Sequence, residues 1–155
     1  MKLKYLILAI AILLSSCEKF MDTEVGTITI ESVTLEKMPI KKSDGASWDE
    51  ISAPDVFFWF EETSVNGGVE TDIWQDLWAH ELPVSWTMSP TFTLSDLSNK
   101  LKVYVYDADL LVDDLIATAE FEFDPTESPD VWTLDLNDDL QITIEVSYTH
   151  IADLF

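Results

Sequence analysis

Residues 101–109 read Leu-Lys-Val-Tyr-Val-Tyr-Asp-Ala-Asp, and the pattern they make recurs through the chain. The odd-numbered positions up to Val105 are aliphatic, and the even-numbered positions up to Tyr106 are lysine or tyrosine. In an extended chain, successive side chains point to opposite faces, so this alternation separates an apolar face from a polar one. The alternation stops at Asp107 and Asp109. We therefore expect a β-strand with one buried face that ends in an acidic loop.

The same alternation recurs elsewhere, and no window shows a sustained period of 3.6 residues. A phase slip at Ser32–Val33 indicates a bulge, and Asn66-Gly67-Gly68 indicates a hairpin turn. Residues 56–60 are apolar throughout, which is typical of a strand buried on both faces. A helical turn over residues 76–81 is too short to change the class. The other predicted strands cover residues 27–35, 56–60, 70–75, 91–94, 121–123, 131–136 and 142–148. The expected fold is all-β, an eight-stranded antiparallel β-sandwich.

The composition fits one acidic globular domain. The 155 residues are 47% hydrophobic and 12% aromatic, which is enough apolar surface for a substantial core. They include 30 acidic residues against eight lysines and no arginine, so the net charge is −22. Both nucleic-acid binding and electrostatic docking on anionic lipid need a basic face. The charge balance therefore argues against both modes of action.

The N-terminal segment has the pattern of an export signal. Two lysines within Met1–Lys4 precede the ten-residue apolar run Tyr5–Leu14, which is too short to span a bilayer. The run leads into Leu-Ser-Ser-Cys, which ends at Cys17, the one cysteine of the chain. This tetrapeptide resembles the lipobox of bacterial lipoproteins.

The lipobox resemblance implies cleavage before Cys17, acylation of that cysteine and retention at a membrane. We expect residues 1–16 to be a signal peptide, residues 17–24 a lipidated cysteine with a short tether, and residues 25–155 the folded domain. The expected location is the bacterial cell envelope, at the outer membrane, on either its periplasmic or its surface face. The membrane would then be a partner through the lipid anchor.

Aspartates gather at the ends of predicted strands. One loop carries Asp49 and, six positions later, Asp55, which opens the next strand. Another carries Asp107 and Asp109, followed by an Asp-Asp pair directly before Leu115. Carboxylates from two adjacent loops repel one another unless they are protonated or neutralised by a cation. The pattern therefore indicates a site for a hard divalent cation.

This arrangement resembles the C2 domain family. In that family a first loop carries an aspartate, a gap of about six residues, and an aspartate opening a strand, as in Pro54-Asp55-Val56-Phe57. A third loop reads Val-x-Asp-x-Asp and then Asp-x-Ile-Gly, to which residues 105–117 correspond. Leu82–Trp86 and Thr91–Leu94 are similar to the Pro-x-Trp and Phe-x-Phe stretch of the same family. The resemblance covers residues 27–148 and implies a C2-like sandwich.

The C2 resemblance also implies a calcium site. Ca²⁺ takes about 6–8 oxygen ligands from flexible loops and suits these carboxylates better than Mg²⁺. The third loop is one residue shorter than the commonest form, which leaves Asp113 as an alternative to Asp114. We favour Asp114 because it directly precedes Leu-Ile-Ala; whether one or two ions bind stays open. Val56 and Ala117 depart from the family's proline and glycine. The implied ligands are Asp49, Asp55, Asp107, Asp109 and Asp114.

An enzyme is not expected. The two histidines, His80 and His150, have no serine or cysteine partner indicated by the sequence, and the one cysteine is assigned to lipidation. A catalytic group needs a positioned partner, so both histidines are interpreted as surface residues. A binding module is the remaining class, and we expect it to be a monomer.

Two binding functions are compatible with the sequence. In the first, Ca²⁺-loaded loops contact a membrane or a partner through apolar tips, which are assigned to Trp48, Leu110, Leu111 and Val112. The aliphatic tip residues fit the core equally well. In the second, Ca²⁺ only braces the loops of a carbohydrate- or protein-binding sandwich, and exposed tryptophans make the contact. Trp48, Trp74 and Trp78 are the tryptophans expected to be exposed, whereas Trp59, Trp86 and Trp132 are expected in the core.

Overall fold

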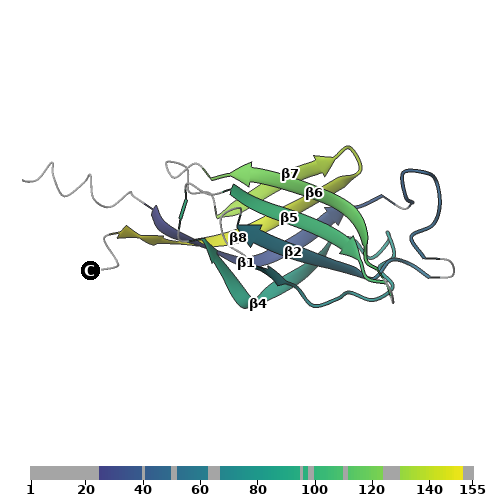
Figure 1. Ribbon diagram of the computed structural model, residues 1–155, viewed down its shortest axis with the longest axis horizontal. Coiled ribbons are helices and arrows are strands. Elements are labelled where there is room, and N and C mark those ends of the chain that lie inside the picture. The colour runs from purple at the N-terminus through teal and green to yellow at the C-terminus, as the bar shows by residue number, and fades with distance from the viewer. Residues whose placement is uncertain are drawn as a thin grey trace, which may run out of the picture.

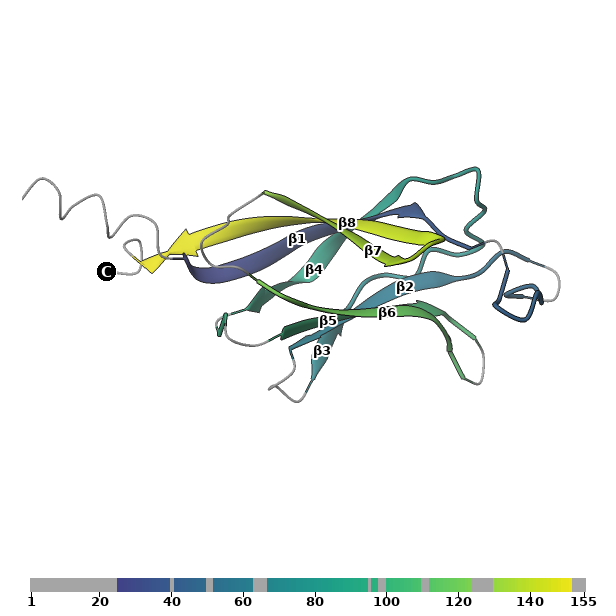
Figure 2. The ribbon, with the colours of Figure 1, turned by 90° about the horizontal axis from the view of Figure 1, so that it is seen from above.

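The computed structural model describes residues 25–39, 41–49, 52–62, 67–94, 96–97, 100–109, 112–123 and 130–151. The predicted signal peptide, Cys17, the predicted tether, Leu110 and Leu111 lie outside these residues. Eight strands form two four-stranded antiparallel sheets, stacked as two layers (Figures 1 and 2). The eight-stranded antiparallel β-sandwich predicted from the alternation is therefore confirmed.

In the two sheets, three pairs of neighbouring strands are consecutive in the chain and three are not. One sheet has the order β4-β1-β8-β7, and the other has the order β3-β2-β5-β6. In the first sheet the strands are β4 (Val84–Leu94), β1 (Val25–Lys37), β8 (Leu140–His150) and β7 (Val131–Asn137). In the second they are β3 (Gly68–Glu70), β2 (Val56–Glu62), β5 (Lys100–Asp107) and β6 (Asp114–Glu122).

Alternating side chains from both sheets fill the space between the layers. Phe58 of β2 and Trp86 of β4 meet edge to face, with ring centroids 5.0 Å apart. Leu101, Val103 and Val105 of β5 are fully buried, as the period-two pattern predicts. Burial of such side chains contributes roughly 1.5–3 kcal/mol each, so the alternation itself fixes the register in which β5 can pair.

Some details differ from the sequence-based expectation. The strand predicted over residues 70–75 is wrong: β3 ends at Glu70, and Trp74 forms only an isolated bridge to Val56. The Thr71 hydroxyl accepts a hydrogen bond from the Phe58 amide at 3.0 Å, so a side chain satisfies a group that a longer strand would have paired. The bulge in β1 is confirmed near its predicted position, at a register shift between residues 30 and 32.

The prediction that β2 is buried on both faces holds only in part. Phe58 and Phe60 face the core, whereas Trp59 lies half-buried on the outer face. The outer-face aromatic residues of β2 pair across the strand with tyrosines of β5, and the Phe57 and Tyr106 rings stack at 5.3 Å. Cross-strand aromatic pairs of this kind stabilise a sheet without a second layer above it.

The two ends of the sandwich are formed by different segments of the chain. Val25, at the start of β1, pairs with His150 at the end of β8, so these two chain segments lie at one end. The loops after β1, after β3 and between β5 and β6 lie at the other end (Figure 2). At about 3.3 Å per residue, the 13 residues of β1 separate the two ends by about 40 Å. We call the second end, formed by the described parts of residues 38–55, 71–83 and 107–114, the loop pole.

Candidate metal centre

Strand register brings three predicted ligands to the loop pole. Asp107 is the last residue of β5 and lies between Val56 of β2 and Asp114, the first residue of β6. Asp55 directly precedes Val56, and its carbonyl oxygen accepts a hydrogen bond from the Ala108 amide at 2.8 Å. The ends of three neighbouring strands therefore hold Asp55, Asp107 and Asp114 side by side, as the sequence predicted from two separate loops.

Asp107 is the central residue of this arrangement. Its side chain is fully buried, which is rare for an aspartate. Oδ1 accepts a hydrogen bond from the Asp55 amide at 2.8 Å. Oδ2 is also buried, and it has no hydrogen-bond partner among the described residues. A buried carboxylate oxygen without a partner is costly, so this atom calls for a proton or a cation.

Burial raises the pKa of Asp107 from its ordinary value of 3.8 to about 6. The hydrogen bond from the Asp55 amide opposes this rise, whereas the charges of Asp49 and Asp109 add to it. Lys42 acts in the opposite direction and lowers the same pKa. Burial and the acidic neighbours thus favour the protonated form of this carboxyl group, whereas nearby positive charge favours the ionised form.

The other predicted ligands are engaged by donors of the protein itself. Asp55 Oδ1 accepts a hydrogen bond from the Asp76 amide at 2.7 Å. Asp49 Oδ2 accepts one from the Ser52 hydroxyl at 3.1 Å. In the third loop Asp113 Oδ1 accepts one from the amide of Asp109 at 3.1 Å. These contacts hold the loops in shape while drawing the carboxylates toward different partners.

Among the described residues, no three or more histidine, cysteine, aspartate or glutamate side chains converge on one point that could hold a metal ion. Mutual repulsion explains this spread, because like charges separate when each can reach another donor. Asp114 shows the effect most directly, since its Oδ2 pairs with Lys42 Nζ instead of turning toward Asp107. Strand register places the backbone positions of these aspartates side by side, whereas their carboxylate groups point to different partners.

Sequence reasoning missed Lys42. Its ammonium group pairs with Asp114 and lies 5.6 Å from the centroid of the Trp48 ring. The hydrogen bond to Asp114 is the main reason that the pKa of Lys42 lies above its ordinary value, and the charges of Asp107 and Asp109 add to it. The available signal was the Lys-Lys pair at 41–42, which holds two of only eight basic residues in the chain.

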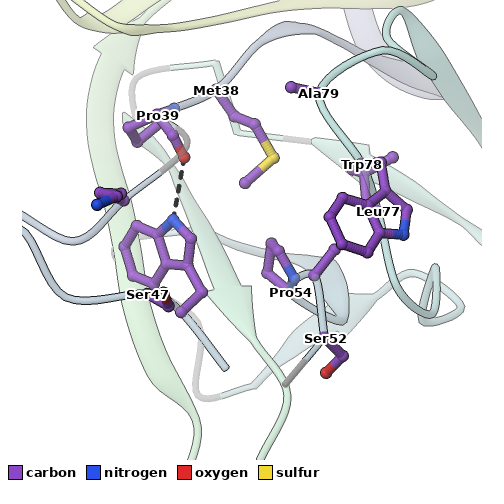
Figure 3. Close-up of a pocket in the computed structure, with 11 residues that line it drawn as sticks. Met38, Pro39, Ser47, Ser52, Pro54, Leu77, Trp78 and Ala79 are labelled. Atoms are coloured by element: carbon purple, nitrogen blue, oxygen red, sulfur yellow. Dashed lines mark hydrogen bonds between the residues drawn. The ribbon is translucent and has the colours of Figure 1, made fainter. Parts of the chain in front are cut away.

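An apolar cavity of about 170 Å³ is lined in part by the loop that carries Asp49 and Asp55. Its other lining residues include Met38 and Trp78 (Figure 3), and Trp48 of that loop also lines it. The Trp48 indole N–H donates to the Pro39 carbonyl at 3.0 Å, which fixes that ring. The predicted exposure of Trp74 and Trp78 is confirmed at 36% and 51%, whereas Trp48 is half-buried.

The remaining predicted residues are placed as follows. Val112 is 77% exposed at the loop pole, and its neighbours Leu110 and Leu111 lie outside the described residues. His80 is exposed in the loop after β3, and His150 ends β8 at the opposite end. Within the part of the chain that the structure describes, no helix is long and apolar enough to cross a membrane.

Comparison with solved structures gives clear matches. A structure described as a C2 domain superimposes with a TM-score of 0.59 at 16% sequence identity, covering 79% of this chain and 97% of that one. The fold is that of a C2 domain. A calcium-bound structure of two C2 domains of Extended-Synaptotagmin 2 matches with a TM-score of 0.57 at 12% identity over 83% of this chain. No protein-family model matches the sequence, and no curated protein matches it either.

These structural matches establish the C2 fold and nothing finer, because all of these sequence identities are low. The chain spans 47% of the Extended-Synaptotagmin 2 chain. Human GIVD cytosolic phospholipase A2, solved with an inhibitor and terbium chloride, matches with a TM-score of 0.59 at 13% identity. That match covers 84% of this chain but only 18% of the enzyme. It therefore carries the C2-like fold and not the activity.

The buried carboxyl group predicts a pH dependence in the absence of metal. Between pH 4 and 6 the folded protein keeps the Asp107 proton that the unfolded chain has released, so the contribution of Asp107 to stability falls as pH rises through this window. The change in pKa from 3.8 to about 6 corresponds to roughly 3 kcal/mol. Urea denaturation in EDTA from pH 4 to 8 measures it.

Asp107→Asn should flatten this pH dependence, because the titrating group is gone. Asp109→Asn removes the same charge two residues away, at an exposed position, and should retain the dependence. An Asp107→Asn protein whose stability falls between pH 4 and 6 as steeply as that of the wild type would contradict the assignment.

Proposed function

We propose that the protein is a membrane-tethered lipoprotein whose C2 domain binds Ca²⁺ at the loop pole and, when loaded, contacts a membrane or a partner. The observation that carries the calcium assignment is Asp107 Oδ2, a fully buried carboxylate oxygen with no hydrogen-bond partner among the described residues. The calcium-bound Extended-Synaptotagmin 2 structure, which shares the fold, supports the same assignment.

The chemistry of these side chains suits a hard divalent cation, although they would have to converge to hold it. Carboxylate oxygens on flexible loops are the ligands that Ca²⁺ prefers. Asp55 and Asp107 lie on adjacent strand ends, and both already bond across the loop pole. A cation bound there would supply the positive charge that the net −22 of the chain does not. The residues that would hold it are Asp49, Asp55, Asp107, Asp109 and Asp114, with Asp113 as the alternative to the last.

Val25, the first described residue after the predicted tether, lies at the end of the domain opposite the loop pole. A tether of residues 17–24 extends at most about 29 Å, since a residue spans at most about 3.6 Å. The loop pole lies about 40 Å from Val25 along β1. Tip-first insertion into the bilayer that holds Cys17 would need the tether to exceed this length. We infer that the loops face away from their own membrane, toward an opposing membrane or partner.

Apolar contact is the mode by which the loop pole would bind lipid. An exposed Val112 and its neighbours Leu110 and Leu111 form one aliphatic run between the ligands Asp109 and Asp114. Each such side chain contributes roughly 1.5–3 kcal/mol when fully buried. Bound Ca²⁺ would reduce the repulsion between the acidic loops and an anionic surface, and the aliphatic run could then enter it.

A second candidate function is binding of a glycan or a protein partner, with Ca²⁺ serving only to brace the loops. The cavity lined by Trp48 and Trp78 favours it, because aromatic rings at a concave surface suit ligands with apolar faces. The same loop contributes to the cavity and to the proposed ligands, since Trp48 precedes Asp49 and Pro54 precedes Asp55.

The first prediction from this function concerns calcium. Ca²⁺ bound to the folded state alone stabilises it by about 2.7 kcal/mol at a hundredfold excess over Kd. Differential scanning fluorimetry should therefore show a rising Tm with millimolar Ca²⁺ in the wild type. Asp107→Asn/Asp109→Asn should show almost no rise, whereas Asp130→Asn/Asp135→Asn, with the same change in charge, should behave as wild type. A Tm independent of Ca²⁺ in the wild type would remove the proposed site.

The anchor gives a separate prediction. The wild type should fractionate with membranes and incorporate labelled fatty acid when it is expressed in a bacterium, because acylation of Cys17 supplies the attachment. Cys17→Ala should lose both properties while keeping the Ca²⁺-dependent rise in Tm, since Cys17 is not among the proposed calcium ligands. Equal fatty-acid labelling of both proteins would exclude the lipoprotein assignment.

The loop tip gives a third prediction. Cosedimentation with vesicles of phosphatidylcholine and phosphatidylserine should require Ca²⁺ and persist at 1 M salt, where the Debye length of about 3 Å abolishes a purely electrostatic bridge. Leu110→Ser/Leu111→Ser/Val112→Ser should lose vesicle binding with calcium affinity intact. Val131→Ser, at an exposed position of β7 that pairs with Glu145 in the middle of β8, is the control. Wild type that never binds vesicles would favour the glycan or protein partner.

A further inference from the structure

The loop pole contains its own cation. Lys42, in the loop after β1, reaches across to the first residue of β6 and pairs through Nζ with Asp114 Oδ2. The side chain of Lys42 is only 28% exposed, which is less than the 45% of Asp114. Trp48 covers it on another side, with the ring centroid 5.6 Å from Nζ. The ammonium group is thus held by a carboxylate and an aromatic ring within the predicted metal centre.

Lys42 and a divalent cation would share the carboxylate of Asp114. Asp114 is one of the carboxylates proposed to hold Ca²⁺, and the Lys42 ammonium already occupies its Oδ2. The charges of Asp107 and Asp109 also act on Lys42. An ammonium ion beside a doubly charged cation is repelled by it at every short distance. The two cations therefore exclude each other from Asp114.

We propose that Lys42 is a built-in competitor of Ca²⁺ at the loop pole, which neutralises Asp114 in the ion-free protein and leaves when the ion binds. This inference rests on the proposed function, because it assigns the regulation of that same site. The competition raises the calcium concentration needed to occupy the site, because the ion has to displace the Lys42 ammonium before the carboxylates can converge. The arrangement also explains why the ion-free loops keep their shape under a strong concentration of negative charge.

The structure provides a place for the displaced side chain. Lys42 and Asp114 line an open polar groove of about 720 Å³ that continues to the turn between β7 and β8. Asp138 and Asp139 of that turn line the same groove. Lys42 can therefore exchange Asp114 for solvent within this groove without crossing the core, so displacement needs no change in the sandwich.

Trp48 should report the displacement. The Trp48 indole is fixed by its hydrogen bond to Pro39, so its ring stays in place when the ammonium group moves. Departure of a cation from the ring changes the electrostatic environment of the indole. A Ca²⁺ titration followed by tryptophan fluorescence should show a change in the wild type, and Trp48→Phe should remove the part that depends on this contact.

The deciding experiment compares Lys42→Met with Lys41→Met in the full chain. Both variants lose one positive charge, but Lys41 is exposed and forms no ion pair among the described residues. Calcium titration by calorimetry should give a Ca²⁺ affinity about fivefold higher for Lys42→Met than for wild type, in line with the modest energy of partly exposed ion pairs. Lys41→Met should stay within about twofold of wild type.

A second measurement keeps the two proposals separate. In EDTA, Lys42→Met should have a lower Tm than Lys41→Met, because only Lys42 neutralises Asp114; in saturating Ca²⁺ this difference should disappear. Equal calcium affinities of wild type and Lys42→Met would overturn the competitor role and leave the calcium site standing. Equal gains in both variants would overturn it too, since long-range charge alone would then explain the effect. Absence of calcium binding in all three proteins would overturn both proposals.

Discussion

The loop pole is organised by the burial of one carboxyl group, that of Asp107. Asp107 ends strand β5, and it lies on the same face as Val103 and Val105, which are fully buried in the core. The pairing of that strand therefore fixes its position. The same register that satisfies the core therefore carries an acid below the surface. Oδ1 accepts a hydrogen bond from the Asp55 amide. Oδ2 has no hydrogen-bond partner among the described residues and therefore favours a proton or a cation.

The fold could be predicted from the sequence because its signal is local. Alternation in β5 and β8 indicates which face of each strand is buried, and this pattern does not depend on which strand pairs with it. The extent of β3 was not predictable, since Thr71 replaces a backbone partner with a side chain. The outer-face position of Trp59 was missed for a related reason: apolar residues on an open sheet face pair across strands and look, in sequence, like core.

The predicted metal centre likewise has one part that follows from strand patterns and one part that does not. The gathering of Asp55, Asp107 and Asp114 follows from strand ends, which the sequence marks. The pairing of Asp114 with Lys42 joins residues 72 positions apart through a loop without periodicity, so no pattern in the sequence could indicate it. In that pairing a lysine holds one of the carboxylates that calcium would need. The C2 fold explains where these acids lie, and the loop after β1 explains why they are spread apart.

If Asp107 Oδ2 lies at a cation site, ion binding there should displace Lys42 from Asp114. Crystal structures of the protein grown in millimolar Ca²⁺ and in EDTA would show both changes. We expect an ion within about 2.3–2.6 Å of Asp107 Oδ2 in the calcium crystals, with the Lys42 ammonium removed from Asp114. A calcium-soaked structure in which Lys42 still pairs with Asp114 and no ion contacts Asp107 would contradict this expectation.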